Sequence, residues 1–151
     1  MSLIHERVRA RGESIAVAES LTGGELLAEI SALAGASSVL RGGVVAYQDR
    51  IKIDVLGVSA RDISEHGVVS AEVARAMAAG VASKFMAEWG VATTGVAGPG
   101  LIDALPVGSA FVAVVGPSFS EAVRFSFDGN RAEIRRACVV SALNLLKKAL
   151  D

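Results

Sequence analysis

Residues 14–24 read SIAVAESLTGG, and this stretch decides the class of fold. The apolar run 14–18 is short and uninterrupted, as expected of a strand that is buried on both faces of a sheet. Gly23 and Gly24 then open the segment 23–33, in which apolar residues recur at helical spacing. A buried strand that passes through a short turn into a helix is the basic unit of an α/β fold.

The remaining chain continues this alternation. Gly116-Pro117 separates the last two expected strands so closely that they must form an antiparallel hairpin. Together these segments predict one domain over 1–151, an α/β three-layer α/β/α sandwich with a mixed, mostly parallel sheet. The further strands are expected at 39–47, 91–94, 107–115 and 120–127, and the further helices at 3–11, 49–56, 60–66, 71–87 and 131–149.

Composition and charge exclude several functional classes. Hydrophobic residues make up 52% of the chain but aromatic residues only 5%, so small aliphatic side chains must form a closely packed core. A net charge of −1 gives no electrostatic reason to expect nucleic acid or an acidic membrane as partner. The start of the chain lacks the apolar run of a signal peptide, and no stretch approaches the ~18 apolar residues of a membrane span. We therefore expect a cytoplasmic protein.

Cysteine and metal-ligating residues are sparse. Cys138 is the only cysteine, and its place in an apolar helical pattern predicts a buried thiol in a reducing compartment. No cluster of cysteine and histidine residues and no pair of carboxylates has the spacing of a metal site. No metal and no cofactor are expected.

Three turns are candidates for chemistry because each follows an expected strand: 19–24, 47–52 and 94–100. In α/β sheets, ligands bind at the carboxyl ends of the strands. In the first turn, Thr22 and Glu25 have the spacing of a capping box, which leaves Ser20 without a capping role. Ser20 is either a nucleophile or ligand contact, with helical N–H groups nearby for an oxyanion, or a plain turn serine. Glu19 is either a buried hydrogen-bond partner or a surface charge.

A serine nucleophile needs a base, and the two histidines are poorly placed for this role. His5 falls in the first helix and His66 at the end of another, so neither suits a triad. A desolvated Lys52, with Tyr47 relaying or orienting the proton, can replace a histidine. The alternative is that Tyr47 only packs and Lys52 is only solvated.

The third turn and the start of the last helix offer groups for a ligand. The glycine-rich segment 94–100 is either a tight loop or a backbone wall of a site, with Thr93 or Thr94 bonding the ligand. This segment lacks the Lys-Ser/Thr ending of a P-loop, so it does not indicate hydrolysis of a nucleoside triphosphate. Arg131 stands at a helix start, where a cation is unfavourable, so it indicates an anionic partner such as phosphate or else a surface salt bridge. Asn130 is the expected N-cap of that helix, supported by Glu133.

With these motifs, the chain resembles the CinA C-terminal domain family, whose enzymes are nicotinamide-nucleotide amidases. The resemblance runs in the family's order over about residues 15–137. The matching stretches are 18–24 (AESLTGG), 43–47 (GVVAY) with Lys52, 56–58 (LGV), 66–70 (HGVVS), 94–100 (TGVAGPG), 106–108 (PVG) and 129–131 (GNR).

The resemblance implies hydrolysis of the carboxamide of nicotinamide mononucleotide to nicotinic acid mononucleotide and ammonia. It implies that Ser20 attacks the carbonyl, while Lys52 and Tyr47 activate the serine and protonate the leaving ammonia. It further implies a pyridine nucleotide as the small-molecule partner, and a homodimer. Oxyanion or substrate contacts are then expected from Thr22, Gly23, Gly24, Gly43, Thr94, Gly95, Gly98 and Arg131.

Two stretches depart from the family pattern. Residues 101–105 are Leu-Ile-Asp-Ala-Leu, where the family usually has a Gly-Gly-Ser/Thr stretch and a lysine. Residues 129–131 are Gly-Asn-Arg, where the family usually has Gly-Asp-Arg. Substrate affinity, specificity or activity could therefore differ. Two alternatives stay open: a non-catalytic nucleotide- or protein-binding module linked to competence or DNA damage, with 101–105 as an interaction surface, and an amidase for another small carboxamide.

Overall fold

A computed structural model describes residues 1–151 in full. One five-stranded sheet organises the chain, with the strand order β2-β1-β3-β4-β5. β1 is parallel to both of its neighbours, β2 and β3, whereas β4 is antiparallel to both β3 and β5. The mixed sheet and the late hairpin are thus confirmed. The strands are β1 (Ile15–Glu19), β2 (Leu40–Val45), β3 (Trp89–Gly95), β4 (Ser109–Gly116) and β5 (Phe119–Ser126).

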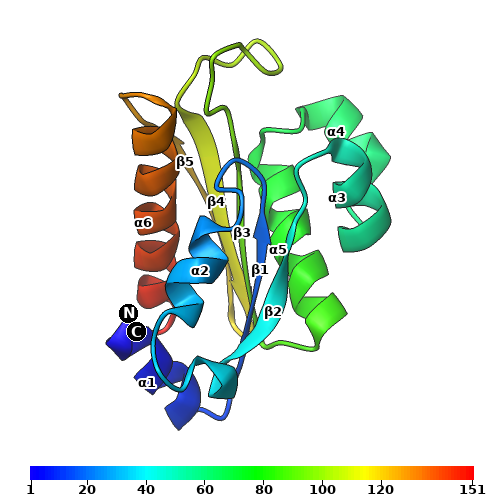
Figure 1. The fold of residues 1–151 in the computed structure, drawn as a ribbon. Helices are drawn as coiled ribbons and strands as arrows, with labels where there is room; N and C mark the ends of the chain where they lie inside the picture. Colours follow the sequence, from blue (N-terminus) through cyan, green and yellow to red (C-terminus); the bar gives the residue numbers. More distant parts are fainter.

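Helices cover both faces of this sheet (Figure 1). α1, α2 and α6 lie on one face, and α3, α4 and α5 lie on the other, which confirms the three-layer α/β/α architecture. The helices are α1 (Ser2–Ala10), α2 (Glu25–Ser31), α3 (Asp49–Leu56), α4 (Ala60–His66), α5 (Ala71–Phe85) and α6 (Arg131–Ala149), with a 3-10 turn at Ala36–Ser38. No helix is long and apolar enough to cross a membrane.

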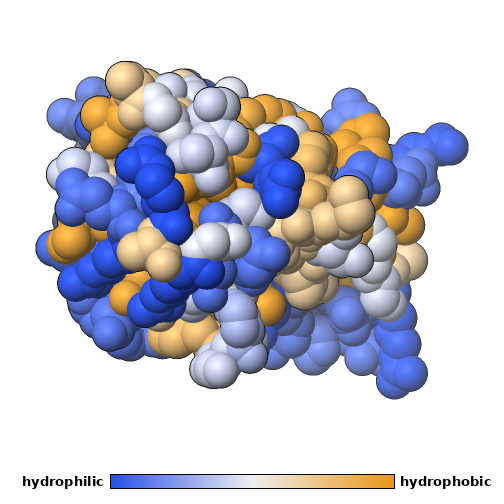
Figure 2. Space-filling model, turned by 90° about the horizontal axis from the view of Figure 1, so that it is seen from below, coloured by the Kyte–Doolittle hydropathy of each residue, from blue (hydrophilic) through white to orange (hydrophobic).

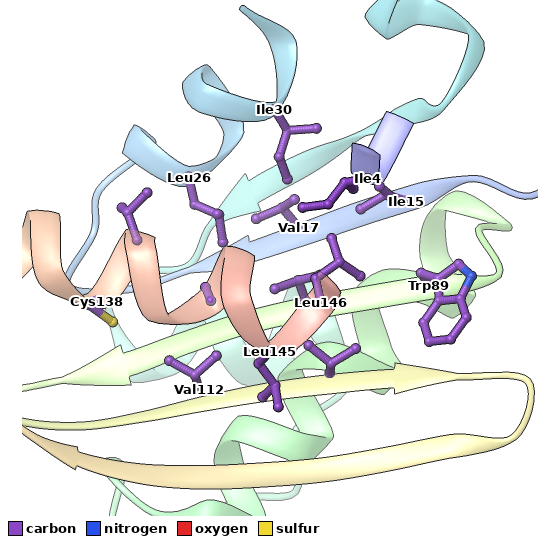
Figure 3. Packing of buried hydrophobic residues seen from close by; sticks show 14 of the residues in the cluster. Ile4, Ile15, Val17, Leu26, Ile30, Trp89, Val112, Cys138, Leu145 and Leu146 are labelled. Atoms are coloured by element: carbon purple, nitrogen blue, oxygen red, sulfur yellow. The ribbon is translucent and has the colours of Figure 1, made fainter. Parts of the chain in front are cut away.

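The two faces of the sheet are packed with side chains of different size. In β1, Ile15 and Val17 face the cluster under α2 and α6, where bulky residues such as Leu146 fill the space (Figure 3). Ala16 and Ala18 alternate with them and face α5, whose buried side is also rich in alanine. Successive strand residues point to opposite faces, so this alternation lets α5 lie close to the sheet.

Gly80 of α5 marks the closest approach on that side. A Cβ there would lie 1.9 Å from the carbonyl oxygen of Leu56, at the end of α3. Gly-to-Ala changes inside helices usually stabilise by about 1 kcal/mol. Here we expect Gly80→Ala to lower the free energy of unfolding by about 2 kcal/mol or more, because α3 and α5 must move apart. Chemical denaturation measures this, with the exposed Ala79→Gly as the propensity control; a more stable Gly80→Ala variant contradicts the packing.

The predicted N-cap of the last helix and the predicted burial of the cysteine are confirmed, and Ser70 caps the start of α5. The Ser70 hydroxyl accepts the N–H of Val73 at 3.3 Å, and Asn130 forms a full capping box with Glu133. Cys138 is fully buried on the inner face of α6, and burial raises the pKa of its thiol to about 12. Figure 2 shows the end of the molecule where the parallel strands begin, and there apolar side chains are scattered among charged ones. The three candidate turns lie at the opposite end (Figure 1).

Candidate active site

The carboxyl ends of β1, β2 and β3 meet at one edge of the sheet. Glu19 lies in register with Val45 on one side and Thr93 on the other. The N–H of Ala46 donates to the Glu19 carbonyl at 2.7 Å, and the N–H of Ser20 donates to the Thr93 carbonyl at 3.0 Å. The three candidate turns therefore come together, as predicted for strand ends of an α/β sheet.

A pocket of about 250 Å³ opens at this edge. Its walls come from Ser20 and Leu21 of the first turn, Tyr47 of the second, the segment from Gly95 to Ile102, and Arg131 of α6. The walls mix polar groups with apolar side chains, which is the usual make-up of a site for a small molecule.

Ser20 occupies the floor of this pocket with a fixed backbone and a free hydroxyl. Its N–H is bonded to Thr93, and its carbonyl accepts the N–H of Gly23 at 3.1 Å. The side chain is mostly buried, and its hydroxyl makes no hydrogen bond within the protein. A buried hydroxyl without a structural partner is available for chemistry or for a ligand.

The start of α2 is capped by Glu19 and not by the predicted Thr22–Glu25 capping box, so that prediction is wrong. One oxygen of the Glu19 carboxylate accepts the N–H groups of Gly24 and Leu26, each at 3.0 Å, and the other accepts the N–H of Leu27 at 2.8 Å. The Thr22 hydroxyl instead bonds the hydroxyl of Thr93 at 2.8 Å. A buried carboxylate at the strand end satisfies three helical donors at once, which the single hydroxyl of Thr22 could not do.

The free N–H groups of the first turn belong to Leu21 and Thr22. The N–H of Gly23 is bonded to Ser20, and that of Gly24 is bonded to Glu19. Thr22 is fully buried and does not line the pocket, so none of the three expected oxyanion donors reaches it, whereas Leu21, which was not expected, does. The two glycines are needed for backbone shape, since their φ angles are +62° and +103°.

Lys52 is buried beneath the second turn. Its ammonium donates to the backbone carbonyl of Tyr47 at 3.4 Å and lies 3.7 Å from the Asp49 carboxylate. Burial lowers the pKa of Lys52, and the charge of Asp49 opposes part of that shift. The expected contact between Lys52 and the Tyr47 phenol is not formed, and no basic side chain lies within hydrogen-bond distance of the Ser20 hydroxyl.

Arg131 spans the mouth of the pocket from the second turn to the third. It donates to the Tyr47 phenol oxygen and to the Gly98 carbonyl, both at 2.7 Å. Both acceptors are neutral, and no carboxylate forms an ion pair with this guanidinium. Its charge is therefore available to an anion that enters the pocket.

The glycines of the third turn line the pocket. Gly98 has a φ of +92°, and a Cβ there would meet Val107 at 3.0 Å. Gly95 packs so tightly on β4 that a Cβ would lie 2.8 Å from both Ala110 and the Ser109 carbonyl. Backbone atoms therefore form this wall. This is the second of the two alternatives given for the segment 94–100.

Five of the eight expected contact residues do not line the pocket: Thr22, Gly23, Gly24, Gly43 and Thr94. The Thr94 hydroxyl donates to the Val68 carbonyl at 3.0 Å and fastens β3 to the segment before α5. Gly43 lies within β2, where a Cβ would be 2.7 Å from the Val17 carbonyl, so its role is close strand packing. His5 and His66 are also absent from the pocket, in agreement with their exclusion as bases.

The altered loop 101–105 forms part of the pocket wall. Leu101 and Ile102 line the pocket, and the Asp103 carboxylate accepts the Val68 N–H at 2.8 Å, which fastens the loop to the segment before α5. The apolar side chains of Leu101 and Ile102 therefore face the pocket.

The fold and the site define an α/β protein with a serine-bearing pocket at the carboxyl ends of three strands. The CinA C-terminal domain family model matches residues 1–150, and the chain belongs to this family. It is 48% identical over 149 residues to a CinA-like protein of Anaeromyxobacter dehalogenans, covering 98% of the chain and 36% of that protein. It is 38% identical to a putative competence-damage inducible protein of Streptococcus pneumoniae, covering 99% of the chain and again 36% of that protein. The chain thus spans about a third of the length of the curated relatives it matches.

Solved structures agree with the computed one. The competence/damage inducible protein of Agrobacterium tumefaciens has 35% identity and a TM-score of 0.91, with 99% of this chain and 91% of that chain covered. The competence damage-inducible protein A of Klebsiella pneumoniae has 31% identity and a TM-score of 0.94, with 99% and 93% covered. The fold expected from the family resemblance is confirmed.

Proposed function

We propose that the chain is an amidase that hydrolyses the carboxamide of nicotinamide mononucleotide, with Ser20 as the nucleophile. The observation that carries the proposal is the unbonded Ser20 hydroxyl, which lines a pocket together with Leu21, whose N–H has no acceptor within the protein. A nucleophile next to an unpaired backbone donor is the arrangement that acyl transfer requires.

The reaction proceeds in two halves. The Ser20 oxygen bonds to the amide carbon and gives its proton to a base, while the carbonyl electrons move to oxygen and are stabilised by the N–H of Leu21. The C–N bond then breaks, the nitrogen takes up a proton and leaves as ammonia, and an ester on Ser20 remains. Water hydrolyses this ester, which releases nicotinic acid mononucleotide and restores the serine.

Lys52 and Arg131 take the two supporting roles. Burial lowers the pKa of Lys52, so a larger fraction of its amine is neutral and able to accept the serine proton. Its anchor at the Tyr47 carbonyl places it at the sheet edge that holds Ser20, because the preceding residue, Ala46, is bonded to Glu19. Arg131 at the pocket mouth binds the phosphate of the nucleotide.

Ammonia release from purified protein tests this proposal. We expect turnover of nicotinamide mononucleotide and much weaker turnover of nicotinamide and nicotinamide riboside, because these lack the phosphate that Arg131 binds. Arg131→Met should raise KM for the mononucleotide while leaving turnover of the riboside unchanged. Faster turnover of an unphosphorylated carboxamide would instead favour an amidase for another small substrate.

A non-catalytic nucleotide-binding module is the second candidate. It is favoured by the distance between the lysine and the serine, since no base contacts the Ser20 hydroxyl in this structure. Catalytic hydrogen bonds often tighten only when the substrate is bound, so the amidase requires Lys52 to approach Ser20 in the complex. Calorimetry with nicotinamide mononucleotide separates them: heat of binding with no ammonia over many hours supports the module.

A further inference from the structure

The loop 101–105 closes in a tight turn beside the pocket. The N–H of Leu105 donates to the Ile102 carbonyl at 2.8 Å, and these two residues pair as an isolated antiparallel bridge. Asp103 and Ala104 between them have φ angles of +49° and +60°. Two successive positive φ angles are typical of a type I′ turn, in which aspartate and asparagine are among the favoured residues. The loop therefore has a defined backbone, and this backbone sets where Leu101 and Ile102 lie.

Asp103 fastens the loop from outside the pocket. Its carboxylate accepts the Val68 N–H at 2.8 Å, and the Val68 carbonyl accepts the Thr94 hydroxyl at 3.0 Å. Gly67 leaves room for this carboxylate, because a Cβ there would lie 2.9 Å from one of its oxygens. The strand β3 thus holds the segment before α5, and that segment holds the loop.

Leu101 and Ile102 are the aliphatic residues of the pocket that remain open to solvent. Leu101 is 67% exposed and Ile102 is 40% exposed, whereas Leu21 and Ala97, which line the same pocket, are 3% and 7% exposed. We call Leu101 and Ile102 the apolar shelf. A flat ring that lies against this shelf would remove its apolar surface from water, which favours binding.

The other walls of the pocket limit which part of a nucleotide can meet the shelf. A substrate with its carboxamide at Ser20 and its phosphate at Arg131 has a pyridine ring and a ribose between these two groups. The ribose hydroxyls need polar partners, whereas the faces of the ring do not. The shelf offers only aliphatic carbon from its side chains, so it fits the ring and not the sugar.

We propose that Leu101 and Ile102 bind the pyridine ring of nicotinamide mononucleotide, and that Asp103 is the positioning residue that holds them beside the pocket. This inference rests on the proposed function and narrows its substrate class. A shelf of this kind selects carboxamides attached to a flat ring over small aliphatic carboxamides.

Calorimetry tests the shelf, with Ser20→Ala as the background so that the ligand is not consumed. We expect the double change Leu101→Ser and Ile102→Ser to weaken binding of nicotinamide mononucleotide by about 10-fold, because hydroxyls replace the apolar surface that the ring covers. Affinity for ribose 5-phosphate should stay within about two-fold, since this ligand has the sugar and phosphate but no ring to meet the shelf. Val140→Ser is the control: Val140 is 45% exposed on α6, away from the pocket, and should change neither affinity.

Two variants of Asp103 separate positioning from charge. Asp103→Ala should weaken binding of the mononucleotide by about 5-fold, because the loop loses its bond to Val68 and alanine disfavours a positive φ. Asp103→Asn should keep the wild-type affinity within about two-fold, because its amide oxygen can still accept the Val68 N–H and asparagine adopts a positive φ. An equal loss in Asp103→Asn would show that the carboxylate acts through its charge, and this overturns the positioning role.

The outcomes for the shelf and for the amidase function differ. If the wild-type chain binds the mononucleotide without releasing ammonia, and the shelf variant binds it more weakly, the amidase proposal fails and the shelf stands. The shelf is overturned if the double variant keeps its affinity, if ribose 5-phosphate is weakened equally, or if the mononucleotide does not bind the background protein. A loss of affinity accompanied by a fall in Tm would also overturn it, because exposed side chains should not support the fold.

Discussion

Replacing Lys52 with Met should remove amidase turnover while making the protein harder to unfold. The ammonium is almost completely buried, and its one carboxylate partner lies at 3.7 Å. A buried cation with so weak a partner costs folding free energy, so a methionine of similar length should stabilise the fold by about 1 kcal/mol. Without the amine, kcat should fall by about 1000-fold, because the proposed mechanism then has no group to accept the Ser20 proton. Ammonia release and chemical denaturation of the same samples check both effects.

The role of Lys52 also predicts how the activity changes with pH. The pKa of Lys52 is lowered by burial and partly restored by Asp49. In the proposed mechanism the neutral amine is the form that accepts the serine proton. Activity should therefore rise with pH toward a pKa below the ordinary 10.5 of lysine. Asp49→Asn should move that rise to lower pH, because the charge that favours the ammonium is gone. Asp54→Asn on the same helix, where Asp54 pairs with exposed Arg50, should leave the profile in place.

Two outcomes would contradict the role of Lys52. A Lys52→Met variant that still releases ammonia at the wild-type rate would exclude the lysine as the base. A variant that loses both activity and stability would show that Lys52 supports the fold, and the loss of turnover would then say nothing about proton transfer.

Ser20→Ala should lower turnover by at least about 1000-fold and leave nucleotide affinity within about three-fold of wild type. The backbone of Ser20 is fixed by Thr93 and Gly23, and its hydroxyl has no partner, so removing the oxygen disturbs neither the turn nor the N–H of Leu21. Removal of an acyl-transfer nucleophile typically costs several orders of magnitude in kcat. Ammonia release gives kcat and calorimetry gives the affinity, with the exposed Ser64→Ala on α4 as control. Full turnover by Ser20→Ala would remove Ser20 as the nucleophile and move attention to a directly activated water.

Much of the fold could be predicted because the deciding signals are local. The buried strand at 15–19, the closely spaced pair that forms the β4–β5 hairpin, and the caps at Ser70 and Asn130 each depend on residues within a few positions of one another. Apolar periodicity and turn chemistry act at this range. The same range explains why all three candidate turns were found.

The capping of α2 shows where local reasoning failed. Thr22 and Glu25 have the spacing of a capping box, but the strand end brings Glu19 under the turn and β3 brings the Thr93 hydroxyl to Thr22. Once a buried carboxylate satisfies three helical donors, the threonine is free to bond elsewhere. The substrate contacts predicted for Gly43 and Thr94 are not formed, for a related reason. Each residue belongs to a matching motif, but the register of the sheet directs it toward a neighbouring segment.

The sequence by itself determined the α/β class, the buried strand that ends at Glu19, and the serine, lysine and arginine around which a site could form. Only the tertiary structure decided which backbone donors stay open beside Ser20, that Lys52 is buried beneath the Tyr47 carbonyl, and that Asp103 fastens the loop 101–105 beside the pocket. The physical reason is that each backbone N–H donates one hydrogen bond. It is available to a substrate only if no acceptor within the folded protein already binds it. Those acceptors come from parts of the chain that only folding brings together.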